Sequence, residues 1–109
     1  MTETLKVHME NAATIKRWHA DGEAVIFDVR EPDEWAAEHI PGAILNPLSA
    51  FDPEKITAPA GKKIVLHCRS GRRCGLASEI LAQTGWKGEV HRMTGGMIAW
   101  NEIGGPVEK

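Results

Sequence analysis

The sequence predicts an α/β fold, in which a parallel β-sheet carries helices on both of its faces. Short apolar segments rich in Val, Ile, Leu and Phe alternate along the chain with segments of helical periodicity. Strands that alternate with helices are typical of a parallel sheet, because each connection has to return across the sheet. The length of 109 residues suits one core, so a single domain is expected over residues 1–109.

The N-terminal third predicts a helix followed by a buried strand. Residues 6–8 are a candidate for a brief strand, and residues 10–22 are predicted to form the helix. Ile15 and Trp18 fall on one face of that helix, and a glycine ends it. Residues 23–30, EAVIFDVR, are rich in Val, Ile and Phe and predict a short buried strand.

The next segment, residues 31–42, begins like a helix. Pro32 suits a first helical turn, and the two acidic residues after it suit the positive end of a helix dipole. A Pro-Gly pair ends the segment. Residues 43–47 then predict a strand, and residues 48–56 predict one weak helical turn.

The second half shows the alternation more clearly. Residues 62–68, KKIVLHC, predict a central strand, and residues 72–85 predict a helix that ends at a glycine. Residues 88–93 predict another strand, and residues 95–105 a final short helix. The tryptophans are expected to pack in or around the core, as large apolar rings usually do: Trp18, Trp35, Trp86 and Trp100.

The composition gives no reason to expect a nucleic acid or a membrane as a partner. The formal net charge is −2, and no apolar stretch approaches the length of a membrane span. The sequence does not show a basic start followed by an apolar run, so a signal peptide is not expected. Two cysteines do not make a disulfide framework, and the histidines are scattered. The sequence therefore predicts a protein of the reducing cytoplasm with no cofactor and no metal.

The stretch from Cys68 to Cys74 carries the most specific chemical signal. Cys68 ends a predicted central strand, and Arg69, Arg72 and Arg73 follow it where the next helix starts. Ligands of open α/β sheets bind at the carboxyl ends of strands, and a helix start directs backbone N–H groups at that point. Such surroundings favour a thiolate, which is the reactive form of cysteine.

The cost of forming this thiolate can be compared with what the loop offers. Lowering a cysteine pKa from about 8.5 to about 6 requires about 3.4 kcal/mol of preference for the anion. A helix end contributes ~0.3–1 kcal/mol, and up to ~2 kcal/mol when it is partly buried. Backbone hydrogen bonds and the arginines are expected to supply the rest. The alternative is a buried structural cysteine beside solvated arginines, but that role does not require a glycine-containing turn.

Three segments resemble the signatures of single-domain rhodaneses, a family of sulfurtransferases. They are DVREPDEWAAEHIPGA at residues 28–43, CRSGRR at residues 68–73, and GGMIAW at residues 95–100. The resemblance covers nearly the whole chain, with the segments in the family's order. It implies a five-stranded parallel sheet flanked by helices, and a persulfide carried on Cys68.

The resemblance also implies roles for other residues. The substrate-binding residues are those of the loop, whose backbone amides cradle the sulfur: Arg69, Ser70, Gly71, Arg72 and Arg73. Asp28 and Arg30 support the site, with Arg30 pairing with a carboxylate such as Glu38. A thiolate of low pKa needs no base, so His39 and His67 are expected to be structural. His67 precedes Cys68 on the strand and therefore points to the opposite face.

A phosphatase or arsenate reductase of the related fold is the main alternative. The loop of these enzymes follows a Cys-x5-Arg pattern that is shaped for a tetrahedral oxyanion. Here Cys74 stands at the position of that arginine, and Arg73 closes a six-residue loop instead. The smaller loop favours a bound sulfur atom. A non-catalytic rhodanese module for protein interaction is the third alternative, and the intact Cys68 and arginine loop argue against it.

Cys74 departs from the family pattern, which often has a small hydroxyl residue at this position. Three roles stay open for it. It could be a weak hydrogen-bond donor to the catalytic sulfur, a resolving thiol that forms a disulfide with Cys68, or a small packing residue in the first helical turn.

Together these inferences predict a sulfurtransferase that works by covalent catalysis. The Cys68 thiolate takes sulfane sulfur from a small anionic donor such as thiosulfate. The persulfide then passes the sulfur to a nucleophilic acceptor, either a thiol or cyanide.

Overall fold

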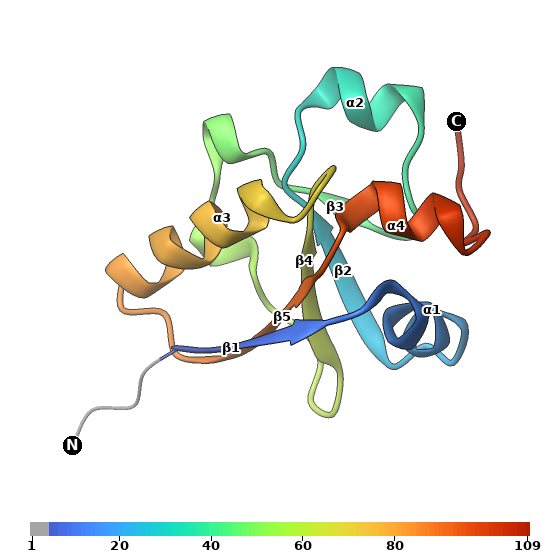
Figure 1. Ribbon diagram of the computed structural model, residues 1–109. Helices are drawn as coiled ribbons and strands as arrows, with labels where there is room; N and C mark the ends of the chain where they lie inside the picture. Colours follow the sequence, from blue (N-terminus) through green and yellow to red (C-terminus); the bar gives the residue numbers. More distant parts are fainter. Residues whose placement is uncertain (1–4) are drawn as a thin grey trace.

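The computed structural model describes residues 5–109 and contains a five-stranded parallel β-sheet with the order β1-β5-β4-β2-β3 (Figure 1). The strands are β1 (Leu5–Glu10), β2 (Ala24–Asp28), β3 (Ile44–Leu45), β4 (Lys63–His67) and β5 (Gly88–Met93). The α/β class and the five-stranded parallel sheet expected from the sequence are confirmed.

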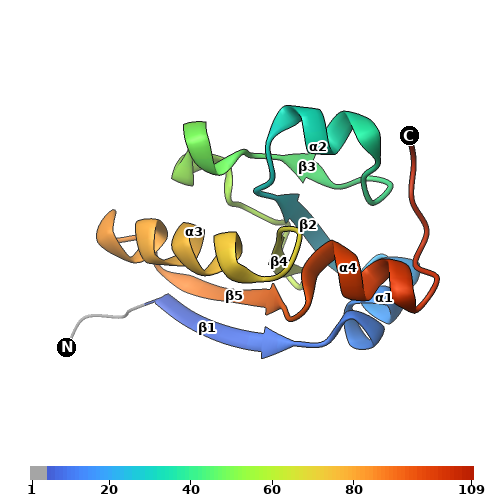
Figure 2. The ribbon, with the colours of Figure 1, turned by 45° about the horizontal axis from the view of Figure 1, so that its top comes forward.

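Helices cover both faces of this sheet (Figures 1 and 2). They are α1 (Ala12–Ala20), α2 (Pro32–Ala37), α3 (Arg72–Gln83) and α4 (Gly96–Glu102), with short 3-10 turns at Leu48–Ala50 and Pro53–Lys55. Helix α3 lies on one face, while α1 and α4 lie together on the other, and α2 lies beside β3. No helix within residues 5–109 is long and apolar enough to cross a membrane.

Each face of the sheet has its own hydrophobic core. Ile15 of α1 and Trp100 of α4 pack with Val65 on one face. Leu81 of α3 packs with Leu66 on the other face. Because alternate residues of a strand point to opposite faces, β4 contributes Val65 to one core and Leu66 to the other. Burial on both faces explains the continuous apolar run that predicts β4.

Strand β1 is longer than the brief strand expected at residues 6–8, and it pairs with β5 along its whole length. It is an edge strand, so one of its long sides has no neighbouring strand within residues 5–109. Val7 and Met9 remain exposed on it. A strand without a buried stripe gives a weak signal in the sequence, which explains the short prediction.

The helix expected over residues 31–42 is also different, because α2 ends at Ala37. The backbone of Glu38 is extended, and His39 forms an isolated antiparallel bridge with Glu108. The strand expected at residues 43–47 is reduced to Ile44–Leu45. The chain at the β3 edge is therefore held mainly by loop contacts.

The order of the strands defines where a ligand can bind. Strands β2 and β4 are neighbours, with Asp28 opposite His67 at their carboxyl ends. From β2 the chain continues to β3 on one side, and from β4 it continues to β5 on the other. Ligands of open α/β sheets bind at such a reversal, where the outgoing connections leave a crevice. Cys68 directly follows β4 and lies at this point.

Candidate active site

The loop from Cys68 to Gly71 joins β4 directly to α3. Cys68 is buried, and its sulfur accepts a hydrogen bond from the backbone N–H of Gly71 at 3.1 Å. Gly71 stands just before the first helical residue with a φ of 103°, a backbone conformation that residues with side chains rarely adopt. The turn at Gly71 thus directs the start of α3 at the cysteine sulfur.

The surroundings of Cys68 lower the pKa of its thiol to about 5. The largest contribution to the lower pKa is a hydrogen bond from the Cys74 side chain, whereas burial raises the pKa. The backbone N–H groups of Cys74, Gly71 and Ser70 also favour the anion. With this pKa, Cys68 is a thiolate at neutral pH and needs no general base.

Cys74 is buried in the first turn of α3, and its thiol donates a hydrogen bond to the carbonyl oxygen of Gly71 at 3.0 Å. Its own pKa is raised, first by the hydrogen bond with Cys68 and then by burial. A thiol that keeps its proton is a donor at neutral pH and attacks slowly. The thiol proton is directed at the Gly71 carbonyl oxygen, so the role of donor to the Cys68 sulfur and the resolving role both stay predictions.

Arg73 is bound to α2 by an ion pair. Its guanidinium donates to both carboxylate oxygens of Glu34, at 2.6 and 2.8 Å. The hydrogen bond from Arg73 is the main cause of the low pKa of Glu34, which is about 2. Glu34 also accepts from the backbone N–H of Glu31. Arg73 therefore connects the start of α3 to α2.

Arg69 and Arg72 are exposed, and they border different hollows. Arg69 borders a groove of about 480 Å³ between α2 and α4, which Met97 also lines. Arg72 borders a separate hollow beside β1, together with Arg92. The arginines that the sequence groups together thus border different hollows, and Arg69, the residue after Cys68, is the one that borders the groove between α2 and α4.

Asp28 and Arg30 form a buried ion pair at the end of β2. Arg30 Nη2 donates to Asp28 Oδ2 at 2.8 Å, and Arg30 Nε donates to both carboxylate oxygens. The expected pairing of Arg30 with the Glu38 carboxylate is wrong: Arg30 donates to the backbone carbonyl of Glu38 at 2.7 Å. The Glu38 carboxylate instead accepts from Asn101, because Glu38 lies beyond α2 with its side chain toward α4.

His67 and His39 both have structural surroundings. His67 is fully buried, with Nε2 3.5 Å from Asp28 Oδ2, and burial lowers its pKa. His39 stacks on Trp35 with ring centroids 3.8 Å apart. Neither ring donates to the Cys68 sulfur in the part of the chain that the structure describes.

The start of α4 fixes the other side of the loop. The backbone N–H groups of Met97 and Ile98 donate to the carbonyl oxygens of Cys68 and Arg69, at 2.8 and 3.1 Å. A Cβ at Gly96 would lie 2.3 Å from the Cys68 carbonyl oxygen, so only glycine allows this approach. The GGMIAW segment therefore contributes to the site through its backbone.

Two residues at the site were not predicted from the sequence. Glu34 was interpreted only as an acid at a helix start, although it also binds Arg73. Arg92 of β5 donates to the carbonyl oxygen of Gly71 at 3.0 Å. Arg92 follows His91 in a strand that also contains Glu89, so the polar pattern of β5 does not single it out.

The fold and the loop define a class of α/β domains with a cysteine of lowered pKa directly after the central parallel strand. A profile of the family described as "Rhodanese-like domain" matches residues 11–103. The chain belongs to the rhodanese family, as its three sequence segments suggested.

Relatives and solved structures agree with this assignment. The chain is 36% identical over 96 residues to an uncharacterized protein of Synechocystis, covering 88% of this chain and 53% of that protein. It is 37% identical over 89 residues to a protein of Allochromatium vinosum named sulfurtransferase, covering 81% and 82%. A crystal structure of a rhodanese-related protein from Thermoplasma volcanium matches with a TM-score of 0.74 and 32% identity, covering 93% and 97%. The chain thus spans about half of the Synechocystis protein and most of the other two.

Proposed function

We propose that the protein is a sulfurtransferase that carries sulfane sulfur as a persulfide on Cys68. The observation that carries this proposal is the Cys68 sulfur, with a pKa of about 5, surrounded by N–H donors at the carboxyl end of the central strand. The 82% coverage of a relative named sulfurtransferase supports it. The loop is one residue shorter than the Cys-x5-Arg loop of phosphatases, because Arg73 is its last residue and position 74 is a cysteine. This shorter loop argues against a phosphatase.

Two displacements complete the reaction. The Cys68 thiolate attacks the outer sulfur of thiosulfate, the sulfur–sulfur bond of thiosulfate breaks, and sulfite leaves with the electron pair. A cyanide ion or a thiolate then attacks the terminal sulfur of the persulfide. The bond between the two persulfide sulfurs breaks, and Cys68 recovers its thiolate. This is nucleophilic catalysis in which one difficult transfer becomes two easier ones.

The loop contributes mainly through donors that are already in place. The terminal sulfur of a persulfide carries negative charge, as the free thiolate does. The N–H groups of Ser70, Gly71 and Cys74 favour such an anion without having to reorganise. Exposed Arg69 attracts the anionic donor to the adjacent groove. The partners are therefore a small anionic donor and a thiol or cyanide acceptor, with thiols abundant in the reducing cytoplasm and neither nucleic acid nor membrane required.

Intact-mass spectrometry after thiosulfate treatment tests the proposal. We expect the mass to rise by a single sulfur atom and to return to its first value with cyanide, which becomes thiocyanate. The Cys68→Ser variant should show no gain, and Cys74→Ser should retain it. A gain that survives in Cys68→Ser would reject the assignment of the sulfur carrier. If no donor loads the protein but p-nitrophenyl phosphate or arsenate is turned over, the alternative enzyme class is correct. No chemistry at all would indicate an interaction module.

A further inference from the structure

Arg92 and Cys74 share one hydrogen-bond acceptor beside the cysteine loop. Arg92 extends from β5, and its Nη2 donates to the Gly71 carbonyl oxygen at 3.0 Å. The Cys74 thiol donates to the same oxygen, also at 3.0 Å. This oxygen belongs to the residue whose N–H binds the Cys68 sulfur. Arg92 is thus one residue removed from the reacting atom.

The first turns of α3 leave space for the Arg92 guanidinium. A Cβ at Gly75 would lie 2.7 Å from Arg92 Nη2 and 3.0 Å from Cζ. A glycine inside a helix makes that helix less stable than an alanine would. Gly75 lies within α3, so the helix has a less stabilising residue at the place where the Arg92 guanidinium packs against it.

The electrostatic setting of Arg92 is unfavourable for stability alone. A cation near a helix N-terminus opposes the helix dipole, and Arg92 lies at the start of α3. No carboxylate within residues 5–109 is at ion-pair distance from Arg92, and its Nε is buried without a partner. The charged groups that share its hollow are Arg72 and Glu79, both on α3.

We propose that Arg92 is a positioning residue for sulfur transfer: by binding the Gly71 carbonyl, it leaves the Cys74 proton free to bond to the Cys68 sulfur. Cys74 has one proton and two acceptors, which are the Gly71 oxygen and the Cys68 thiolate. A guanidinium is a charged and therefore stronger donor than a thiol. Both donors bind the Gly71 carbonyl oxygen in the structure, and the guanidinium alone can satisfy it when the thiol proton turns to the ionised Cys68 sulfur. This inference rests on the proposed function only in making Cys68 the sulfur carrier.

The thiolate fraction of Cys68 measures this effect directly. Alkylation of Cys68 by iodoacetamide, followed by peptide mass spectrometry across pH, gives its titration midpoint without any sulfur donor. For Arg92→Leu we expect the midpoint to rise by about one pH unit, so that reactivity below the midpoint falls about tenfold. Arg17→Leu is the matched control, because it removes the same charge from an exposed position on α1. Its midpoint should equal that of the wild type.

A double-mutant cycle separates positioning from a simple charge effect. Cys74→Ala should raise the Cys68 midpoint by itself. If Arg92 acts through the Cys74 proton, Arg92→Leu adds nothing further in the Cys74→Ala background. An undiminished second shift would show that Arg92 acts on Cys68 as a charge and would overturn the proposal, as would an unchanged midpoint in Arg92→Leu alone.

Two further measurements keep the outcome clear. Gly75→Ala retains Arg92 but pushes its guanidinium from the carbonyl, so it should raise the midpoint even if Arg92→Leu does not fold. Normal alkylation in Gly75→Ala would contradict the proposal. Persulfide formation is followed separately by intact mass. A midpoint that shifts as expected in a protein that never gains sulfur would reject the sulfurtransferase while leaving the positioning role intact.

Discussion

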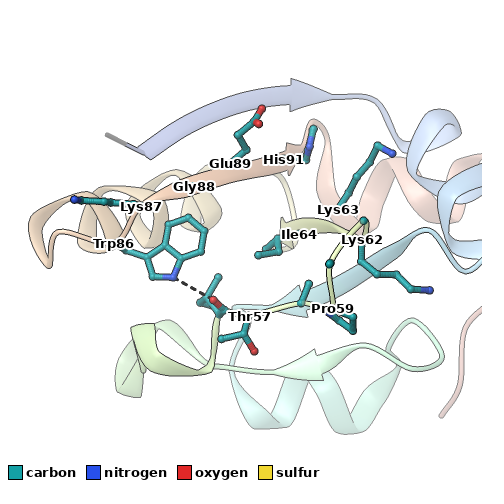
Figure 3. A pocket seen from close by; sticks show the side chains of 14 residues that line it. Thr57, Pro59, Lys62, Lys63, Ile64, Trp86, Lys87, Gly88, Glu89 and His91 are labelled. Atoms are coloured by element: carbon teal, nitrogen blue, oxygen red, sulfur yellow. Dashed lines mark hydrogen bonds between the residues drawn. The ribbon is translucent and has the colours of Figure 1, made fainter. Parts of the chain in front are cut away.

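The two ends of the sheet both present basic side chains around a hollow, and they differ in what those groups surround. At the carboxyl end, Arg69 and Arg73 accompany the Cys68 sulfur. At the amino end, a hollow of about 710 Å³ lies between the starts of β4 and β5, and its lining includes Lys62 and Lys87 (Figure 3). The amino end thus also presents cations around a hollow, but no cysteine lines it.

The basic groups at the amino end are directed away from their hollow. Lys62 donates to the Gly22 carbonyl oxygen, and Lys63 lies 3.8 Å from the Glu23 carboxylate. Figure 3 shows these lysines extending outward, while the Trp86 ring faces the hollow and donates to the Ile56 carbonyl at 3.1 Å. At the carboxyl end, backbone N–H groups converge on one sulfur. Convergent donors, rather than the number of cations, distinguish an anion site from a basic surface.

The largest expected effect comes from disturbing this convergence with a single methyl group. Gly96→Ala places a Cβ 2.3 Å from the Cys68 carbonyl oxygen at a φ of 54°. We expect a loss of about 2–3 kcal/mol in the free energy of unfolding, because the loop or α4 has to move. Sulfur transfer should fall at least about tenfold, since a displaced loop loses its N–H geometry. Urea unfolding and thiocyanate formation measure the two effects.

Gly61→Ala is the control at the amino end. Gly61 lines the hollow there, has a φ of 85°, and would place its Cβ in open space. Backbone strain alone should cost about 1 kcal/mol, with turnover unchanged. Equal losses of turnover in both variants would mean that activity follows general stability, and the distinction between the two ends would fail.

The pH dependence gives an effect of intermediate size. The pKa of Cys68 in the folded protein is about 5, below its value in the unfolded chain. The thiolate therefore stabilises the fold above the unfolded pKa, and this stabilisation is lost as the pH falls toward 5. We expect the wild type to lose more stability than Cys68→Ser over this range, and the alkylation of Cys68 to be constant near neutral pH and to decline near pH 5.

His91 at the amino end provides a comparison for this titration. Burial and the nearby His8 lower the pKa of His91 in the folded protein. Protonation of His91 therefore also favours the unfolded chain, and this effect begins as the pH falls through the pKa of about 6.5 that His91 has when unfolded. His91→Gln should remove that part of the acid sensitivity and leave the alkylation profile of Cys68 unchanged. A shifted alkylation profile in His91→Gln would show that the two ends are electrostatically coupled.

The elements that the sequence predicts well are those buried on both faces or ended by clear signals. β4 is a continuous apolar run because it has a helix layer on each side, and it was predicted almost to its ends. β1 was predicted short because an edge strand exposes Val7 and Met9. The end of α2 at Ala37 depends on the bridge between His39 and Glu108, which no local pattern contains.

At the site, the sequence located the cysteine and its loop because strand, glycine and helix start are adjacent in the chain. It did not indicate which arginine is free. Arg73 pairs with Glu34, and Arg92 binds Gly71, across long separations in sequence. Arg30 is the opposite case, because its carboxylate partner Asp28 is two residues away while the more distant Glu38 supplies only a carbonyl. Pairings of this kind depend on how elements pack, which spacing alone does not determine.

The smallest expected effect concerns the ion pair that holds Arg73. Glu34→Gln removes a carboxylate that accepts from Arg73 at 2.6 and 2.8 Å. Both side chains are partly exposed, so the stability loss should be only about 0.5–1 kcal/mol. The site also becomes more positive, and the apparent KM for thiosulfate should fall about twofold at low salt, where the Debye length is ~30 Å, and be unchanged at high salt.

Glu23→Gln makes the same change of charge beside Lys63 at the amino end. The two ends are separated by the length of β4, whose five residues span ~16 Å at about 3.3 Å per residue. This exceeds the Debye length of ~10 Å at 0.1 M salt, so Glu23→Gln should leave the KM unchanged at that ionic strength. If Glu34→Gln raises the KM instead, Glu34 holds Arg73 in a position that binds the donor. Arg73 would then belong with Arg69 in substrate binding, and the carboxyl end would use convergent cations as well as convergent N–H groups.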